Sequence, residues 1–219
     1  MNVTKRDNRV EQFDTEKIHE VLFWATEDIK GVTVSDIEIK VAPQFYDGIT
    51  SKEIHQVLVQ GSADMITEKT PNYQHVAANL LNFYLRKEVF GASDNMPTLL
   101  DVINKNIQSD IYDKEVLEYY SEAEIKKLDN IIKHKRDYDF VYAGLQQLID
   151  KYLIKDRSTG TIYETPQFMY MLICMTLHGK EKDKVRRRAL IKDLYNDLST
   201  FKISLPTPIM CGVRTPSRQ

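Results

Sequence analysis

The sequence predicts a mainly α-helical fold with one small β-hairpin at its N-terminus. Apolar residues recur with helical spacing over most of the 219 residues, and polar residues that favour helix starts precede these stretches. Strand-forming residues flank a tight-turn signal in Val3 to Phe13. A second, short strand pair is expected only at Tyr152 to Tyr163, so helices dominate the predicted fold.

The composition is that of an ordinary globular protein. Apolar residues make up 42%, charged residues 28%, and the formal net charge is -2, which excludes a disordered chain or one that coats nucleic acid. Cys174 and Cys211 are too few for a disulfide scaffold or a zinc site, which favours a reducing environment. We find neither a signal peptide nor a stretch of ~18 apolar residues. We expect a soluble cytoplasmic protein, in the host cytoplasm if the source is a phage, with no membrane partner.

A hairpin and a first helix are expected at the N-terminus. Asp7-Asn8 interrupts the strand-forming residues, and asparagine tolerates the positive backbone angles of a tight turn. Asp14 can then cap a helix, because its side chain can accept a hydrogen bond from the first helical turn. The apolar residues of this helix fall on one face: Ile18, Val21, Leu22 and Ala25.

Three further helical segments are expected before residue 91. After a break at Gly31, residues 34–45 are predicted as a shorter helix or mixed segment. Thr50 and Glu53 form a capping-box pattern that starts the next helix. Residues 73–90 are predicted as a fourth helix, with the following glycine as its stop signal. Residues 1–91 are therefore expected to form one compact module.

Residues 92–200 are predicted as a second helical region. The polar stretch 92–97 separates this region from the first module. Ser121 with Glu124 repeats the capping-box pattern, which predicts a helix start at that point. A further helix is predicted over residues 140–151, directly before the expected second hairpin.

The last part of this region is predicted to hold two more helices. Pro166 suits the first residue of a helix, and residues 167–177 are apolar enough to be buried on most sides. The basic run 180–188 leads into the last helix, which is expected to end near Thr200. We interpret this run as a charged helix face rather than a nucleic-acid site, because no aromatic residues interleave with its cations.

The first module carries four motifs in a fixed order: Val3-Thr4-Lys5-Arg6-Asp7, Val10-Glu11-Gln12-Phe13-Asp14 with Lys17-Ile18, Tyr46-Asp47-Gly48-Ile49, and Leu85-Arg86-Lys87. Their order and spacing resemble those of an ATP cone. The resemblance implies a hairpin packed on a four-helix unit over residues 1–91, with ATP or dATP as an allosteric effector. Tyr84 stands where some members inhibited by dATP carry histidine, so inhibition by dATP stays open.

The resemblance also implies an effector site. It places three lysines on the phosphate side, wraps the nucleoside with residues 11–17, and adds one hydroxyl contact. The implied set is Lys5, Glu11, Gln12, Phe13, Asp14, Thr15, Glu16, Lys17, Ser51 and Lys87. Cations from separate elements can neutralise a triphosphate near helix N-termini. Each lysine alone could be a solvated surface charge, but the joint pattern favours the site. No metal is expected, because His19 and His55 lack metal-binding spacing.

The second region also carries motifs: Thr165-Pro166-Gln167-Phe168-Met169-Tyr170, Ser199 to Met210, and Gly212-Val213-Arg214-Thr215-Pro216. They resemble the N-terminal helical domain of the large subunit of class I ribonucleotide reductase, an oxidoreductase that converts ribonucleoside diphosphates to deoxyribonucleoside diphosphates. In that family, the segment corresponding to residues 201–219 leads into an α/β barrel. The resemblance therefore implies a helical domain over 92–200 followed by a lead-in segment.

No catalytic residue is expected in this chain, because the family's reacting cysteines and carboxylate belong to the barrel. Cys174 is interpreted as a buried small hydrophobe and Cys211 as a bystander. Thr207 has two open interpretations. The resemblance places it near the substrate phosphates, as a substrate-binding residue, whereas locally its hydroxyl could stabilise the turn between Pro206 and Pro208.

The first functional hypothesis is the N-terminal product of a split large-subunit gene. It would need a second chain with the catalytic barrel and a radical-generating small subunit, and the completed large subunit would form a homodimer. The apolar segment 201–219 is expected to be exposed and prone to association. The alternative is a stand-alone ATP-cone sensor or transcriptional regulator, although the four cysteines of a zinc ribbon are absent. A third possibility is a piece of an intact enzyme. No nucleic-acid partner is expected under the first hypothesis.

Overall fold

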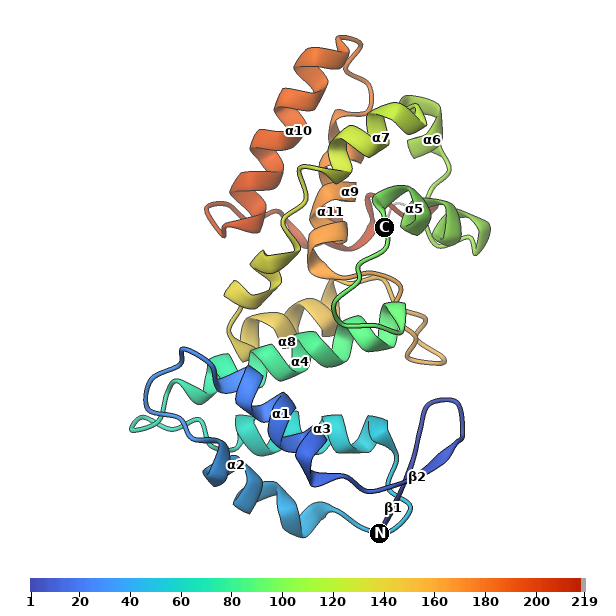
Figure 1. Cartoon of the computed structure of the whole chain (residues 1–219). Coiled ribbons are helices and arrows are strands. Elements are labelled where there is room, and N and C mark those ends of the chain that lie inside the picture. The colour runs from blue at the N-terminus through green and yellow to red at the C-terminus, as the bar shows by residue number, and fades with distance from the viewer. Residues whose placement is uncertain (218–219) are drawn as a thin grey trace. The chain divides into compact units, whose positions relative to one another are not determined.

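The computed structural model describes residues 1–217, which divide into two compact units (Figure 1). Unit 1 comprises residues 1–84 and 140–146, and unit 2 comprises residues 85–139 and those from 147 onward. Over the described residues, the chain is mainly helical with one small antiparallel sheet, so the predicted fold class is confirmed. None of the helices in this range combines the length and apolarity that crossing a bilayer requires.

Unit 1 begins with the hairpin and continues with helices. Its elements are β1 (Asn2–Thr4), β2 (Val10–Gln12), α1 (Thr15–Thr26), α2 (Val34–Val41), the 3-10 helix η1 (Ala42–Gln44), α3 (Ser51–Ala63) and most of α4 (Tyr73–Phe90). Asp14 accepts a hydrogen bond from the Glu16 N–H at 3.0 Å, as predicted for the cap of α1. Gly91 follows α4 with a φ of 77°, which confirms its role as a stop signal.

Helices α2 and α3 pack closely at Gly61. The core of unit 1 is apolar and fully enclosed, and it includes Leu22, Ala25, Ile37, Val41, Ile49, Leu58, Val76 and Leu80. A Cβ atom added at Gly61 would lie 2.4 Å from Cγ1 of buried Val41. The missing side chain of Gly61 therefore sets the distance between the two helices.

Unit 2 is built from short and long helices. They are α5 (Leu99–Gln108), α6 (Glu115–Tyr119), α7 (Glu122–Asp129), the 3-10 helix η2 (His134–Asp139), α9 (Pro166–His178), α10 (Lys184–Ser199) and α11 (Thr207–Gly212), and α8 (Tyr142–Lys151) spans both units. Helix α9 starts at Pro166 as predicted, and its first ten residues are all buried. Cys174 lies fully buried within α9, which confirms its interpretation as a small hydrophobe.

Two sequence predictions in unit 2 are wrong in detail. The second hairpin forms only one isolated bridge, between Lys155 and Ile162, and no assigned strands. Backbone hydrogen bonds on both sides of this bridge still close the expected turn, from the Asp156 N–H to the Thr161 carbonyl at 2.9 Å and from the Tyr163 N–H to the Ile154 carbonyl at 3.1 Å. The Ile154 N–H instead donates to the buried Glu164 carboxylate at 2.9 Å. Helix α10 ends at Ser199 but is not the last helix, because α11 follows. Proline within the first turn of α11 is tolerated, since the N–H groups of that turn need no helical partner.

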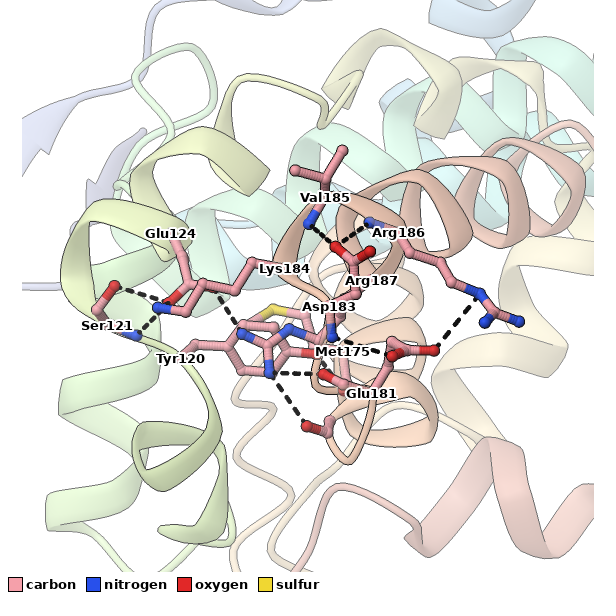
Figure 2. A network of polar contacts seen from close by, with 11 residues as sticks. Tyr120, Ser121, Glu124, Met175, Glu181, Asp183, Lys184, Val185, Arg186 and Arg187 are labelled. Atoms are coloured by element: carbon pink, nitrogen blue, oxygen red, sulfur yellow. Dashed lines mark hydrogen bonds and ion pairs between the residues drawn. The ribbon is translucent and has the colours of Figure 1, made fainter.

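The capping box of α7 also joins α7 to α10 (Figure 2). Glu124 accepts a hydrogen bond from the Ser121 hydroxyl at 2.8 Å and forms ion pairs with Lys184 at 3.1 Å and Arg187 at 2.6 Å. Partial burial alone would raise the pKa of Glu124, but these hydrogen bonds outweigh it and lower the pKa to about 2. The basic run is therefore not a simple solvated face, because Arg187 is buried and its guanidinium carbon lies 4.4 Å from the centre of the Tyr120 ring.

A buried ion pair fixes the end of the described chain to unit 2. Both side chains of the Arg214–Glu164 pair are almost fully enclosed, and Arg214 Nε lies 3.0 Å from Glu164 Oε2. Arg214 also donates to the carbonyls of Met210 and Tyr152 at 2.6 and 2.9 Å. Glu164 accepts from the Tyr112 hydroxyl at 2.9 Å. The buried charges are thus fully hydrogen-bonded, as stability in an apolar interior requires.

The expectation of an exposed apolar segment after residue 200 is therefore only partly correct. Phe201 and Ile203 are 49% and 42% exposed. In contrast, Met210, Gly212 and Arg214 are buried within unit 2. The ion pair explains the difference, because it holds residues 210–214 against the unit. Residues 218–219 of the predicted segment lie outside the described residues.

We predict that Gly61→Ala destabilises unit 1 by about 1–3 kcal/mol, because the new methyl group overlaps Val41. This cost outweighs the gain of about 1 kcal/mol in helix propensity. Gly144→Ala in α8 is the matched control, since its Cβ would meet its nearest neighbour at an ordinary 3.7 Å. The free energy of unfolding of unit 1 is measured by urea denaturation. The signal is the fluorescence of Trp24, which is the single tryptophan and lies in α1. Equal effects of the two substitutions would contradict close α2–α3 packing.

We predict that Arg214→Met costs about 3–5 kcal/mol, because it leaves the buried Glu164 charge without its partner. Denaturation of the full chain followed by circular dichroism measures this loss. The double variant Arg214→Met/Glu164→Gln should be more stable than the sum of the two single losses implies. A cost below about 0.5 kcal/mol, typical of an exposed arginine, would show that this pair does not anchor residues 210–214.

Candidate functional site

Strand β1 is hydrogen-bonded along both edges. On one edge it pairs with β2, with Val3 opposite Glu11. On the other edge, the Thr4 N–H donates to the Ile49 carbonyl at 3.0 Å, and Thr4 forms a parallel bridge with Thr50. The Asn2 N–H donates to the Asp47 carboxylate at 2.7 Å. Strand β1 is therefore hydrogen-bonded both to β2 and to residues 47–50, which lie about 45 positions further along the chain.

This pairing brings several of the predicted effector residues together. Lys5 directly follows the bridged Thr4, and Ser51 directly follows the bridged Thr50. Glu11 lies on β2, and Lys17 lies in the first turn of α1. The hairpin, α1 and the start of α3 therefore contribute neighbouring polar side chains to one part of unit 1.

The Glu11 carboxylate lies among three cations. Its Oε2 is 3.3 Å from Lys5 Nζ and 3.9 Å from Lys17 Nζ, and its Oε1 is 3.7 Å from an Arg9 nitrogen. Lys17 also lies 3.8 Å from Asp14. We call Lys5, Arg9, Glu11, Asp14 and Lys17 the hairpin charge cluster. Its cations can bind an anion that competes with these carboxylates.

Arg9 was not among the residues predicted from sequence. Its guanidinium forms an ion pair with Asp7 at 2.6 Å. Hydrogen bonding to Arg9 lowers the pKa of Asp7, and the same bond raises the pKa of Arg9. Sequence spacing could have indicated Arg9, because it precedes β2 by one residue and lies two positions from Glu11, a spacing that places side chains on the same face of an extended chain.

Helix N-termini add positive potential beside the cluster. Asp14 caps α1, and Thr50 caps α3 through a complete capping box with Glu53. Hydrogen bonds from the Thr50 hydroxyl and N–H and from the Tyr46 hydroxyl lower the pKa of Glu53. Backbone N–H groups in the first turn of a helix favour anions. Ser51 is the first residue of α3, so its half-buried side chain lies at such a terminus.

The other predicted residues of the 11–17 segment lie outside the hairpin charge cluster. Phe13, Thr15 and Glu16 line a pocket of about 560 Å³, which also includes His19 and Glu38. Because a helix turns by 100° per residue, Lys17 faces away from the side of α1 on which Thr15 and His19 lie. The structure therefore divides the predicted set between two faces of α1. The exposed Gln12 belongs to neither group and pairs with Asn2 in the sheet.

An aromatic group on α1, α3 and α4 was also missed by sequence reasoning. The His55 ring lies 5.4 Å from the Phe83 ring and 6.1 Å from the Tyr84 ring, and Trp24 contacts Phe83 at 5.5 Å. His55 follows Ser51 by one helical turn. The aromatic group therefore continues the face of α3 that begins with Ser51. Its members lie on three helices, so sequence spacing alone gave no signal for it.

The two remaining predicted site residues belong to unit 2. Lys87 lies in the last turn of α4, four residues after Phe83 on the same helix. Thr207 is exposed at the start of α11, where the structure has a helix rather than the isolated turn considered from sequence. Neither residue is placed relative to the hairpin charge cluster.

The described residues contain no evident centre for metal or thiol chemistry. Among residues 1–217, no group of three or more histidine, cysteine, aspartate or glutamate side chains could hold a metal ion. Burial raises the pKa of the Cys174 thiol well above its usual range. The Cys211 sulfur donates to the Lys151 carbonyl at 3.1 Å.

Comparison with known proteins agrees with both parts of the sequence. The family described as ATP cone domain matches residues 1–88, and the family described as ribonucleotide reductase, all-alpha domain, matches residues 138–218. The chain is similar to the N-terminal part of ribonucleotide reductase large subunits. The match over residues 138–218 favours this family over a stand-alone regulator with an ATP cone.

Several large subunits of ribonucleotide reductase are similar over the whole chain. Ribonucleoside-diphosphate reductase 1 subunit alpha of Escherichia coli K12 is 45% identical over 99% of the chain. Ribonucleoside-diphosphate reductase subunit alpha of Enterobacteria phage T4 is 42% identical and that of Helicobacter pylori is 31% identical, in both cases over the whole of this chain. The chain spans 28% of the length of the first two relatives and 27% of the third.

We predict that Glu11→Gln strengthens the binding of inorganic tripolyphosphate by roughly threefold to tenfold, because the carboxylate competes for Lys5 and Lys17. Titration calorimetry at low ionic strength measures the change. Glu20→Gln is the matched control, since it removes the same charge from an exposed site on α1. An equal gain in both variants would show a general charge effect, and a loss in Glu11→Gln would contradict competition within the cluster.

Proposed function

We propose that this chain is the effector-binding portion of a ribonucleoside-diphosphate reductase large subunit. Residues 1–91 form the ATP cone, residues 92–200 the helical domain, and residues 201–219 lead into the catalytic part. The family match and the hairpin charge cluster support the proposal. The chain would support conversion of ribonucleoside diphosphates to deoxyribonucleoside diphosphates together with a polypeptide that carries the catalytic barrel.

The hairpin charge cluster is the observation that carries the proposal. Lys5 and Lys17 come from different elements and share one carboxylate, Glu11. A nucleoside triphosphate carries several negative charges, so it can replace this single carboxylate and gain more charge-assisted hydrogen bonds. Ser51 at the N-terminus of α3 supplies a hydroxyl beside the same strand. These features fit the triphosphate of ATP or dATP.

The geometry favours different roles for the predicted residues. We assign Lys5, Lys17 and Ser51 to the phosphate side of the effector. Phe13, Thr15 and Glu16 line the pocket on the other side of α1 and are assigned no phosphate contact. Lys87 remains a predicted phosphate ligand from the family resemblance. No metal is assigned to the protein at this site.

The partners follow from the same assignment. The chain would require a polypeptide with the catalytic barrel and a radical-generating small subunit, and the completed large subunit would form a homodimer. Thr207 remains a proposed contact to the substrate phosphates, because it lies exposed in the segment that the family continues into its barrel. A cytoplasmic location is part of this proposal.

We predict that Lys5→Gln/Lys17→Gln weakens ATP binding by roughly tenfold to a hundredfold, because two charged contacts to the phosphates are lost. Titration calorimetry of the full chain with ATP and dATP measures both affinities. Lys30→Gln/Lys69→Gln is the control, since both lysines are exposed in unit 1 and the net charge changes equally. Unchanged affinity in the first variant, or an equal loss in the control, would refute the assignment.

Lys87→Gln tests the family-derived ligand separately. A further loss of affinity in the triple variant would support its place on the phosphate side, and no loss would remove Lys87 from the site. The conversion of ribonucleoside diphosphates is expected only after addition of the barrel-bearing polypeptide and the small subunit. Reductase activity of the purified chain alone would overturn the proposed division of labour.

A further inference from the structure

The 3-10 helix η2 is hydrogen-bonded to two longer helices, α4 and α10. Helix α4 is continuous from Tyr73 to Phe90 and carries Lys87, the predicted phosphate ligand, in its last turn. Helix α10 ends at Ser199, directly before the segment proposed to lead into the catalytic part. Element η2 therefore contacts both the helix that carries Lys87 and the helix that precedes this segment.

The contact of η2 with α4 is made by Arg86. The Arg86 side chain is 5% exposed, and its Nη2 donates to the His134 carbonyl at 2.6 Å and to the Asp137 carboxylate at 3.1 Å. Its Nη1 donates to the Tyr138 hydroxyl at 3.3 Å, and its guanidinium carbon lies 4.8 Å from the centre of that ring. Asp137 is fully buried. Because buried charges are costly without their partners, η2 must follow a shift of this end of α4.

The contact of η2 with α10 is made by Arg136, the residue next to Asp137. Arg136 Nη1 donates to the Asn196 side chain at 2.9 Å and to the Ser199 hydroxyl at 2.5 Å. The guanidinium carbon of Arg136 also lies 5.6 Å from the centre of the Tyr195 ring. Both ends of this arrangement are thus fixed by an arginine, one donated by α4 and the other donated by η2 to the last turn of α10.

Two features allow a small shift of η2 to have a larger effect. Element η2 has six residues, which is long for a 3-10 helix, and the hydrogen bonds of such helices have poorer geometry than those of α-helices. Phe201 follows α10 by two residues and has a φ of 60°, in the left-handed region that residues other than glycine rarely adopt. A shift at Ser199 therefore acts on a strained turn and changes the direction of the chain beyond it.

Arg86 and Lys87 are neighbours on one helical turn, and their side chains point about 100° apart. A phosphate bound by Lys87 therefore acts on the same turn that Arg86 attaches to η2. We propose that η2 transmits effector binding from α4 to the end of α10, with Arg86 and Arg136 as its two contacts. This coupling rests on the proposed function, in which Lys87 binds effector phosphates, and adds that the segment after α10 responds to the effector.

Hydrogen–deuterium exchange of the full chain, measured by mass spectrometry with and without saturating ATP, tests the coupling. We expect ATP to slow amide exchange in residues 196–204 by about fivefold, at the lower end of typical allosteric couplings. Arg136→Met should abolish this slowing, because it breaks the contact with α10, and should leave ATP affinity within about twofold. Lys135→Met is the matched control, since it removes the same charge from an exposed neighbour on η2 and should retain the slowing.

A second variant breaks the contact with α4. Arg86→Met/Asp137→Asn removes both charges of the buried pair, so neither is left without its partner. Circular dichroism checks its fold, and at saturating ATP the slowing in residues 196–204 should be lost. Slowing that persists in this variant or in Arg136→Met, or that is equally lost in Lys135→Met, would overturn transmission through η2.

The wild-type chain separates this coupling from the proposed function. If calorimetry shows ATP binding but exchange in residues 196–204 is unchanged, η2 only anchors the helices, and the coupling is overturned while the effector site stands. If the wild-type chain does not bind ATP, the proposed function fails and the coupling fails with it. Lys87→Gln at saturating ATP should also remove the slowing, and persistence of the slowing would show that it does not begin at Lys87.

Discussion

The hydrogen bonding of β1 on both edges is the constraint on which the proposed effector site depends. A hairpin of two three-residue strands is marginally stable by itself. Here the bonds from Asn2 and Thr4 to residues 47–49 attach it to the segment that starts α3. Without this attachment, Lys5 would have no fixed position relative to Ser51, and the lysines would not act together on one ligand.

The same constraint explains the electrostatics of the hairpin charge cluster. Fixing Lys5, Arg9 and Lys17 near one another would cost free energy through repulsion, and the Glu11 carboxylate between them offsets this cost. The cluster is thus stabilised by its own ion pairs and can exchange one carboxylate for a more highly charged ligand. In the interior of unit 2, the buried positive charge of Arg214 is likewise compensated by the negative charge of Glu164.

The elements that depend on local chemistry could be predicted from the sequence. The Asp14 cap, the capping boxes at Thr50 and Ser121, and the stop at Gly91 each require only residues a few positions apart. The Arg214–Glu164 pair joins residues 50 positions apart, so no local pattern indicates it. The short helix α11 was missed because Pro206 and Pro208 on either side of Thr207 suggested a turn. Residues 13–17 are divided between two faces of α1. The sequence could not predict this division, because it depends both on where α1 begins and on which side of α1 the pocket lies.

The most direct test of the central claim is a crystal structure of the chain with a non-hydrolysable ATP analogue. We expect phosphate oxygens within ~4 Å of Lys5 and Lys17 Nζ, with the Glu11 carboxylate displaced from at least one of these lysines. The hairpin bonds to residues 47–50 should remain. A nucleotide bound in the pocket beside Phe13 and His19, with the Glu11 ion pairs intact, would contradict the account.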